Sequence, residues 1–202
     1  NEPGCAVYID IASGKSILFY PQLPEELAIW MGDLPTLDDL KGTYGFEEVM
    51  FTEKAREYLT QNPPAKLHAL KDTFLMEDCP YEIEETEVLN AIGDLRQCKD
   101  ENELIYTKYA CSVNRAALDD VFRWIHPNIY EHQVEAVLTK RYIDSYCRYY
   151  AFTTIVCSGE HCNTLHYHRN DQFIHDGDLV LIDTGCEYAG YSSDNTRTIP
   201  AN

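Results

Sequence analysis

Asp183 and Asp194 are the residues whose setting points most directly to chemistry. Asp183 ends the apolar, strand-like run 179–182, and Asp194 follows two serines beyond a turn. Both would lie within paired, half-buried strands, where a charge without a partner is costly. Two carboxylates in such a setting therefore call for an explanation.

The geometry of a hairpin can be derived from the spacing of these residues. With Ala189-Gly190 at the centre of the turn, Tyr188 faces Tyr191 and Asp194 lies opposite Gly185. Side chains alternate between faces with a period of two, so the two aspartates share one face as diagonal neighbours. Their backbones would be roughly 7–8 Å apart. A one-residue bulge would break this arrangement.

Two like charges at that distance repel each other unless one is protonated or cations neutralise both. Two divalent ions about 3.5–4 Å apart fit such a pair, with one carboxylate terminal and the other bridging. Carboxylates alone favour Mn, Mg or Ca, and an added histidine shifts the preference towards Mn, Co or Zn. On spacing alone, two ordinary aspartates on a solvated hairpin face remain an alternative.

Composition narrows the class of protein. The chain has 202 residues, 45% hydrophobic content and a net charge of -18. The charge excludes a generic affinity for nucleic acid or anionic lipid. No apolar run approaches the ~20 residues of a membrane span, and no signal peptide is present, so we expect a cytoplasmic protein without membrane association. The absence of an initiator Met predicts that residue 1 is not the natural start.

The eight cysteines are scattered, without a Cys-x-x-Cys pair. Because most lie among apolar residues, we expect buried thiols in a reducing compartment. The segment "CSGEHCNTLHYH" gathers cysteine and histidine, but its intervals match no standard zinc spacing. The cysteines are Cys5, Cys79, Cys98, Cys111, Cys147, Cys157, Cys162 and Cys186.

Residues 1–88 read as a small α/β unit, itself truncated at its N-terminus. The stretch 5–21 predicts a β-hairpin around "ASGKS", and 23–45 mixes short helical signals with Pro and Gly. A helix is expected within 51–64, followed by a strand and turn in 65–75. No internal repeat is evident.

Residues 89–202 predict a second α/β domain, present only in part. Asp100 and Glu103 form a capping box before a long helix over 104–125. A second helix is expected from Glu131 to about Tyr146, followed by a β-rich run, a polar loop and the hairpin. Expected core-facing residues are Leu104, Tyr109, Ala116 and Val121 in the first helix, and Val134, Val137, Leu138 and Tyr142 in the second.

Several segments, in order, resemble the pita-bread metallopeptidases. "VLIDTGCEYAGYSSDNTRTIP" resembles their first metal-ligand hairpin, "LRQCKDENELIYTKYACSVNRAA" their Arg…Lys-x-x-x-Glu-Leu helix, and "IVCSGEHCNTLHYH" their Ser-Gly-Glu-Asn…Leu-His-Tyr segment. "IHDGDLVLIDTG" resembles the Gly-Asp approach to the metal strand. Within the family, "EPGCAVYIDIASGKSILFYPQLPEELAIWMG" is most similar to the Xaa-Pro dipeptidase (prolidase) branch, and aminopeptidase P is also similar. The resemblance implies a creatinase-like N-terminal domain and then the first part of a pita-bread domain.

The resemblance also implies roles for individual residues. Asp183 would be a terminal ligand to one metal and Asp194 the bridge between two, Mn first, with Zn or Co as alternatives. His166 would contact substrate and help stabilise the intermediate, and Trp30 would reach the active site of the partner subunit in a homodimer. A polar loop histidine and a plain hydrophobic contact are the alternatives for His166 and Trp30. Thr196 and Arg197 match the motif and would shape the strand.

Some positions depart from the family pattern. Phe152 stands where a tyrosine is expected near the metals, and His168 replaces a small residue. Arg169-Asn170 replaces the usual His-Ala or His-Gly, which weakens any detailed role for this loop. The family's remaining ligands, one His and two Glu, would follow beyond residue 202.

For the whole protein, the resemblance implies hydrolysis of the bond before proline in small Xaa-Pro peptides. Two metals would generate a hydroxide near neutral pH. We expect this chain alone to be inactive and to hold the metals poorly. An aminopeptidase P-like exopeptidase, and a non-catalytic pita-bread scaffold that has lost its metals, are the alternatives.

Overall fold

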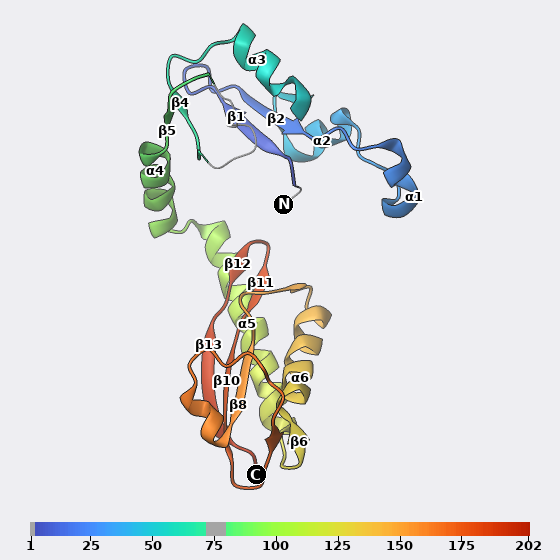
Figure 1. Ribbon diagram of the computed structural model, residues 1–202, viewed down its shortest axis with the longest axis vertical. Coiled ribbons are helices and arrows are strands. Elements are labelled where there is room, and N and C mark those ends of the chain that lie inside the picture. Colours follow the sequence, from blue (N-terminus) through green and yellow to red (C-terminus); the bar gives the residue numbers. More distant parts are fainter. Residues whose placement is uncertain (1–2, 72–79) are drawn as a thin grey trace. The chain divides into compact units, whose positions relative to one another are not determined.

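The computed structural model describes residues 3–71 and 80–202, and it divides into two compact units, Asn1–Gln97 and Cys98–Asn202 (Figure 1). The boundary expected between residues 88 and 89 falls inside helix α4 (Thr86–Gln97), which lies in the first unit. Each unit mixes helices and strands, so the α/β class predicted from the sequence is confirmed.

The first unit is built on the sheet β1-β2-β3. Strands β1 and β2 form the antiparallel hairpin that the sequence predicts, and β2 and β3 run parallel. A short parallel pair, β4-β5, follows. The elements are β1 (Ala6–Ile9), β2 (Ser16–Tyr20), η1 (Glu25–Leu27), α1 (Ala28–Met31), α2 (Leu37–Tyr44), β3 (Glu48–Phe51), η2 (Thr52–Lys54), α3 (Ala55–Gln61), β4 (Leu67–His68), β5 (Ile83–Glu84) and α4.

Strand β2 is covered on both faces. Ile17 and Phe19 pack against Ala55 of α3, whereas Leu18 and Tyr20 pack with Leu40 of α2. Alternate residues of a strand point to opposite faces, so this split places one helix on each side of the sheet. The strand expected within 65–75 is present as β4, and positions 72–75 of that prediction lie outside the described residues.

The second unit consists of two helices and short antiparallel sheets, with the orders β13-β10-β8, β12-β11-β7 and β6-β9. Figure 1 shows α5 and α6 running alongside these strands. The elements are α5 (Glu101–Trp124), β6 (Ile129–Tyr130), α6 (Glu131–Asp144), β7 (Tyr149–Tyr150), β8 (Ile155–Ser158), η4 (Gly159–Asn163), β9 (Phe173–Ile174), β10 (Leu179–Thr184), β11 (Cys186–Tyr188), β12 (Tyr191–Ser192) and β13 (Asn195–Pro200).

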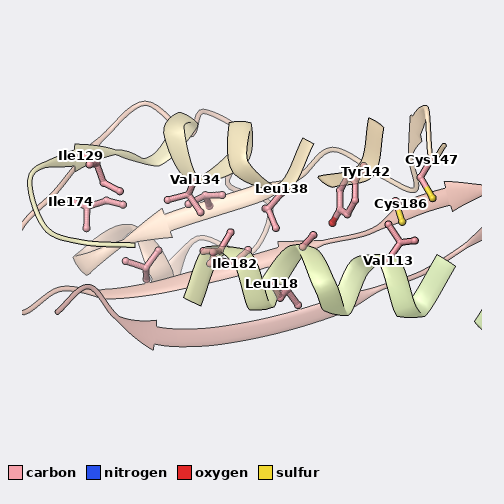
Figure 2. Packing of buried hydrophobic residues seen from close by; sticks show 14 of the residues in the cluster. Val113, Leu118, Ile129, Val134, Leu138, Tyr142, Cys147, Ile174, Ile182 and Cys186 are labelled. Atoms are coloured by element: carbon pink, nitrogen blue, oxygen red, sulfur yellow. The ribbon is translucent and has the colours of Figure 1, made fainter. Parts of the chain in front are cut away.

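The core of this unit lies between the helices and the strands. Figure 2 shows Leu138 and Tyr142 of α6 and Leu118 of α5 directed towards the strands that carry Ile182 and Cys186. Removing such apolar side chains from water stabilises the fold by about 25 cal/mol per Å². The strands of the hairpin are therefore held against the helices by one of their faces.

Helix α5 begins with the predicted capping box, but the residues that it buries differ from most of those predicted to face the core. Asp100 Oδ1 accepts from the Glu103 amide at 2.8 Å, and Glu103 Oε2 accepts from the Asp100 amide at 2.7 Å, so the capping box is confirmed. Leu104 and Tyr109 are 40% and 37% exposed, and their prediction as core residues was wrong. The buried stripe advances by three or four residues at a time and includes Val121, as predicted, together with Ala110, Val113, Ala117 and Leu118; Ala116 is only partly buried.

The face of α6 is the predicted one. Val134, Leu138 and Tyr142 are fully buried, and Val137 packs at the edge of the same core.

The prediction that most cysteines are buried thiols was only partly right. Cys147, Cys157 and Cys186 are buried, Cys5 and Cys162 are half-buried, and Cys98 and Cys111 are exposed; Cys79 lies outside the described residues. In the part of the chain that the structure describes, no helix is long and apolar enough to cross a membrane.

Candidate metal-binding hairpin

Asp183 lies in the middle of a sheet. Its strand, β10, pairs with β13 on one side and β8 on the other, where Asp183 is opposite Thr196 and Ile155 respectively. Ile182 and Thr184 are fully buried against the helices, so alternation places Asp183 on the other face. Asp183 Oδ1 is buried and accepts no hydrogen bond, and it is the only such side-chain oxygen or nitrogen among residues 3–71 and 80–202.

The predicted register of the hairpin is confirmed. Tyr188 pairs with Tyr191 at the tip, and Asp183 pairs with Thr196 in the next part of the ribbon. Both pairings follow the same register, so neither strand carries an extra residue between them. Asp194 therefore remains diagonal to Asp183 on one face, and its side chain is exposed.

Between the pair Asp183–Thr196 and the pair Tyr188–Tyr191, the backbones of the two strands approach each other unusually closely at Gly185 and Ser193. A Cβ placed on Gly185 would lie 1.9 Å from Ser193 O and 3.0 Å from Phe152 Cε1. The Ser193 amide donates to Cys186 O at 2.9 Å, and Ser193 Oγ accepts from the Cys186 amide at 3.1 Å. Glycine in the Asp-x-Gly sequence is thus required by close backbone approach, directly beside both aspartates.

A buried hydrogen-bond network fixes β10 from the helix side. Asn114 Nδ2 donates to Thr184 O at 2.9 Å, and Tyr142 Oη donates to Asn114 Oδ1 at 2.8 Å. Tyr142 Oη also lies 2.8 Å from Thr184 Oγ1, which is 3.1 Å from Thr154 Oγ1. Burial raises the pKa of Tyr142, so this phenol stays protonated as a donor. The network holds the residue that directly follows Asp183.

On the Asp183 face, the sheet is covered by an apolar cluster. Ile155, Cys157 and Tyr167 are buried together, with Cys162 and Leu181 at the edge. Burial raises the pKa of the Cys157 thiol, and the adjacent Cys162 and the charges of Glu131 and Asp183 add to that shift. The segment around Tyr167 therefore crosses the face from which the Asp183 carboxylate projects.

Glu131 of α6 binds the segment around Tyr167 through hydrogen bonds. Its side chain is fully buried at the first residue of α6, where the helix dipole favours a negative charge. Oε1 accepts from the amide and the hydroxyl of Ser158, both at 2.8 Å. Oε2 accepts from Tyr167 Oη at 2.8 Å and from the Gln172 amide at 3.0 Å. Every one of these donors belongs to β8 or to the loop that carries Tyr167.

His166 and Trp30 lie in different surroundings from the aspartates. His166 is exposed, next to the buried Tyr167, and its ring faces that of His168 with centroids 6.0 Å apart. Trp30 belongs to α1 of the first unit and is 84% exposed. The structure thus brings Asp183 and Asp194 onto one face and carries His166 on a segment that packs there. The roles of all four residues stay predictions.

The departures from the family pattern have local explanations. Asn170 is buried with φ +49°, a left-handed backbone that glycine or asparagine accommodates, and its side chain bonds Val156 N and Thr154 O. Arg169 pairs with Asp171 at 2.7 Å. The ring of Phe152, where a tyrosine was expected, packs against Gly185. Arg197 donates to Thr196 O at 2.7 Å, on its own strand.

Sequence reasoning missed Glu131 and Tyr167. The sequence indicates Glu131 only as the first residue of a helix, although an acidic residue at that position is a signal for a dipole-stabilised charge. Tyr167 stands out in the sequence only as part of a Leu-His-Tyr match. Neither pattern predicts that these two side chains, 36 residues apart in the sequence, form a hydrogen bond.

The donor set suits a hard divalent ion. A buried carboxylate oxygen without a hydrogen bond is costly unless a cation completes it. A second carboxylate follows on the same face, and oxygen ligands are those that Mn, Mg and Ca prefer. Among the described residues, no three His, Cys, Asp or Glu side chains gather closely enough to hold an ion by themselves. Asp183 and Asp194 are therefore candidate ligands, and their role in binding an ion stays a prediction.

Comparison with known proteins agrees with this geometry. The model of metallopeptidase family M24 matches residues 106–202, and that of the aminopeptidase P N-terminal domain matches residues 1–68. The second unit belongs to metallopeptidase family M24. The chain is 30% identical to the Xaa-Pro dipeptidases of Mus musculus and Homo sapiens, aligned over all of its own length and 44% of theirs.

Solved structures give the same result. The Pseudomonas aeruginosa aminopeptidase PepP superposes with a TM-score of 0.87 at 28% identity, over all of this chain and 50% of that one. The chain thus spans about half the length of the relatives it matches. The fold class expected from the sequence, an aminopeptidase P-type N-terminal domain followed by part of a pita-bread domain, is confirmed.

Proposed function

We propose that this chain supplies the first two metal ligands of an Xaa-Pro peptidase of the prolidase type. Asp183 and Asp194 would hold two divalent ions, with Mn as the first choice and Zn or Co as alternatives. The observation that carries the proposal is the buried Oδ1 of Asp183, which accepts no hydrogen bond, in a hairpin whose two ladders keep the same register on either side of Gly185 and Asp194.

The spacing of aspartates in a relative supports this assignment. Two solved Escherichia coli aminopeptidase P structures, 25% identical to this chain, are alanine variants of aspartates separated by the same interval as Asp183 and Asp194. Another structure of that enzyme is a complex with substrate.

The chain's residues have distinct tasks in this proposal. When bound, the two ions supply a hydroxide near neutral pH and polarise the scissile carbonyl. Gly185 and the Tyr142 network fix the positions of the two carboxylates, and His166 contacts the substrate and the charge that develops on it. Trp30, exposed together with Ile29 on α1, contacts the substrate site of a partner subunit in a homodimer.

Dipeptides are the proposed substrates because the amino-terminal segment, with its Gly-Lys-Ser turn and Trp-Met-Gly, resembles the prolidase branch. Aminopeptidase P is the second candidate, since a Colletotrichum graminicola protein described as a probable Xaa-Pro aminopeptidase is 27% identical over 99% of this chain. In the whole protein, Gly-Pro and a Gly-Pro-initiated tripeptide distinguish the two. Turnover of the dipeptide supports prolidase, whereas turnover of the tripeptide alone supports aminopeptidase P.

Metal binding by the 202-residue chain tests the core of the proposal. In a titration with Mn²⁺ followed by electron paramagnetic resonance, we expect the chain to bind Mn²⁺ weakly and Asp183→Asn or Asp194→Asn to abolish that binding. Asp176→Asn is the matched control, an exposed aspartate in a turn of the same unit. Equal binding by the double Asp183/Asp194 variant and the wild type would refute the assignment. We also expect the 202-residue chain not to cleave Ala-Pro in the presence of Mn²⁺.

A further inference from the structure

The loop Tyr167–Gln172 is a built structure rather than an exposed connection. Glu131 Oε2 accepts hydrogen bonds from Tyr167 Oη and from the Gln172 amide, which closes the loop on one carboxylate oxygen. Within the loop, Asn170 is buried and bonds Val156 N at 2.9 Å and Glu135 Oε2 at 2.9 Å. Both ends and the middle of the loop are therefore tied to α6 and β8.

The same carboxylate also holds the strand beside Asp183. Glu131 Oε1 takes both donors of Ser158, the last residue of β8. Strand β8 pairs directly with β10, with Ile155 opposite Asp183. One fully buried charge thus connects the strand next to the proposed metal ligand with the loop that follows His166. Charge-assisted bonds of this kind are short and strong, so the connection is rigid.

Tyr167 determines where its neighbours can lie. Its ring is buried on the Asp183 face with Ile155 and Cys157, and its hydroxyl reaches Glu131. His166 and His168 flank it and are both exposed. Because the tyrosine is fixed at both its ring and its hydroxyl, the backbone of His166 has little freedom to shift relative to β10.

We propose that Glu131 and Tyr167 are positioning residues that hold His166 over the hairpin carrying Asp183 and Asp194. This inference rests on the proposed function for the role of His166 towards a metal-bound substrate. Neither Glu131 nor Tyr167 is placed to touch substrate, because both side chains are buried in the protein. Their effect passes through the Tyr167–Glu131 hydrogen bond and the packing of the tyrosine ring.

Tyr167→Phe is the decisive variant, since it keeps the ring and removes only the hydroxyl. Proton–carbon NMR of the 202-residue chain follows the His166 ring, assigned with His166→Gln, while Mn²⁺ is added as a paramagnetic probe. In the wild type, we expect Mn²⁺ to broaden the His166 ring signal together with the Thr184 and Asn195 amides. In Tyr167→Phe, the amides are still broadened and the broadening of His166 is lost.

A second variant and a matched control keep the test sharp. Glu131→Gln removes the charge at nearly the same volume and should also displace the His166 signal. Tyr191→Phe removes another tyrosine–glutamate hydrogen bond of the same unit, 2.9 Å to Glu103, and should leave the His166 signal unchanged.

Each outcome decides between the two proposals. Equal broadening of His166 in the wild type, Tyr167→Phe and Glu131→Gln would overturn the positioning role. Failure of Mn²⁺ to broaden the hairpin amides in the wild type would instead refute the metal site. In that case the metal-free His166 signal still tests positioning: a shift in Tyr167→Phe but not in Tyr191→Phe supports it, and no shift rejects it.

Discussion

Replacing Gly185 by alanine is the most direct test of how the hairpin is built. The added Cβ would lie 1.9 Å from Ser193 O and 2.9 Å from Ser193 C. Neither contact involves a flexible side chain, so the two strands must separate. Overpacking of this kind costs about 1–3 kcal/mol. If two of the Ser193–Cys186 hydrogen bonds are also lost, at about 0.5–1.5 kcal/mol each, the free energy of unfolding falls by about 2–6 kcal/mol.

Urea denaturation can measure this loss in the second unit alone. The chain has two tryptophans, and Trp124 of α5 reports on the second unit once Trp30 is replaced by phenylalanine. In that background, we expect Gly185→Ala to lower the unfolding midpoint by about 1 M urea or more. The variant should also bind Mn²⁺ less tightly, because strand separation moves Asp194 away from Asp183.

Gly190→Ala is the matched control in the same hairpin. A Cβ there meets no atom within 4 Å, and its φ of +86° adds only the strain of a left-handed backbone, about 1–2 kcal/mol. Gly185→Ala should therefore be the more destabilising of the two. The reasoning fails if Gly185→Ala unfolds at the same urea concentration as the parent chain, or at a higher one than Gly190→Ala.

Three further substitutions test other parts of the second unit. Tyr142→Phe removes the hydroxyl that bonds Asn114 Oδ1 and Thr184 Oγ1, two buried groups. It should lower the free energy of unfolding by about 1–3 kcal/mol in the same urea assay. Ala189→Asn should stabilise by roughly 0.5–1 kcal/mol, since alanine has φ +51° in the turn and asparagine tolerates the left-handed region better. The hydrogen bond from Arg141 lowers the pKa of Asp120, so its stabilisation is complete above the unfolded-state pKa of about 3.9 and is lost as pH falls through the lower folded-state pKa. Asp120→Asn should therefore lower stability at pH 7 by a few tenths to about 1 kcal/mol, and denaturation curves of variant and parent should converge in acid.

The hairpin could be predicted from sequence because its information is local. An apolar run, a two-residue turn and a period of two fix which residues face each other, and the register agrees at Tyr188 and at Asp183. The capping box of α5 is local for the same reason. Both predictions needed only neighbouring residues and the geometry of one element.

Features that depend on contacts between elements were beyond the sequence. Leu104 and Tyr109 are apolar or aromatic and were expected in the core, yet the buried stripe of α5 follows the residues that face α6 and the strands. The close approach at Gly185 depends on how two strands meet Phe152. Glu131 is satisfied by Ser158, Tyr167 and Gln172, whose positions no single-element pattern predicts.

Hydrogen bonds within the protein hold the strand that carries Asp183, the proposed metal ligand. Protein hydrogen bonds alone hold Thr184 from the helix side and close the ribbon at Ser193. The Asp183 oxygen nevertheless has no donor within the described part of the chain. A carboxylate that is fixed in place but left without a partner gains from a cation without any ordering cost, as pre-organised sites do. Binding of Mn²⁺ should consequently raise the urea midpoint of the second unit while its far-ultraviolet circular dichroism stays constant, and a gain of secondary structure on binding would contradict a preformed hairpin.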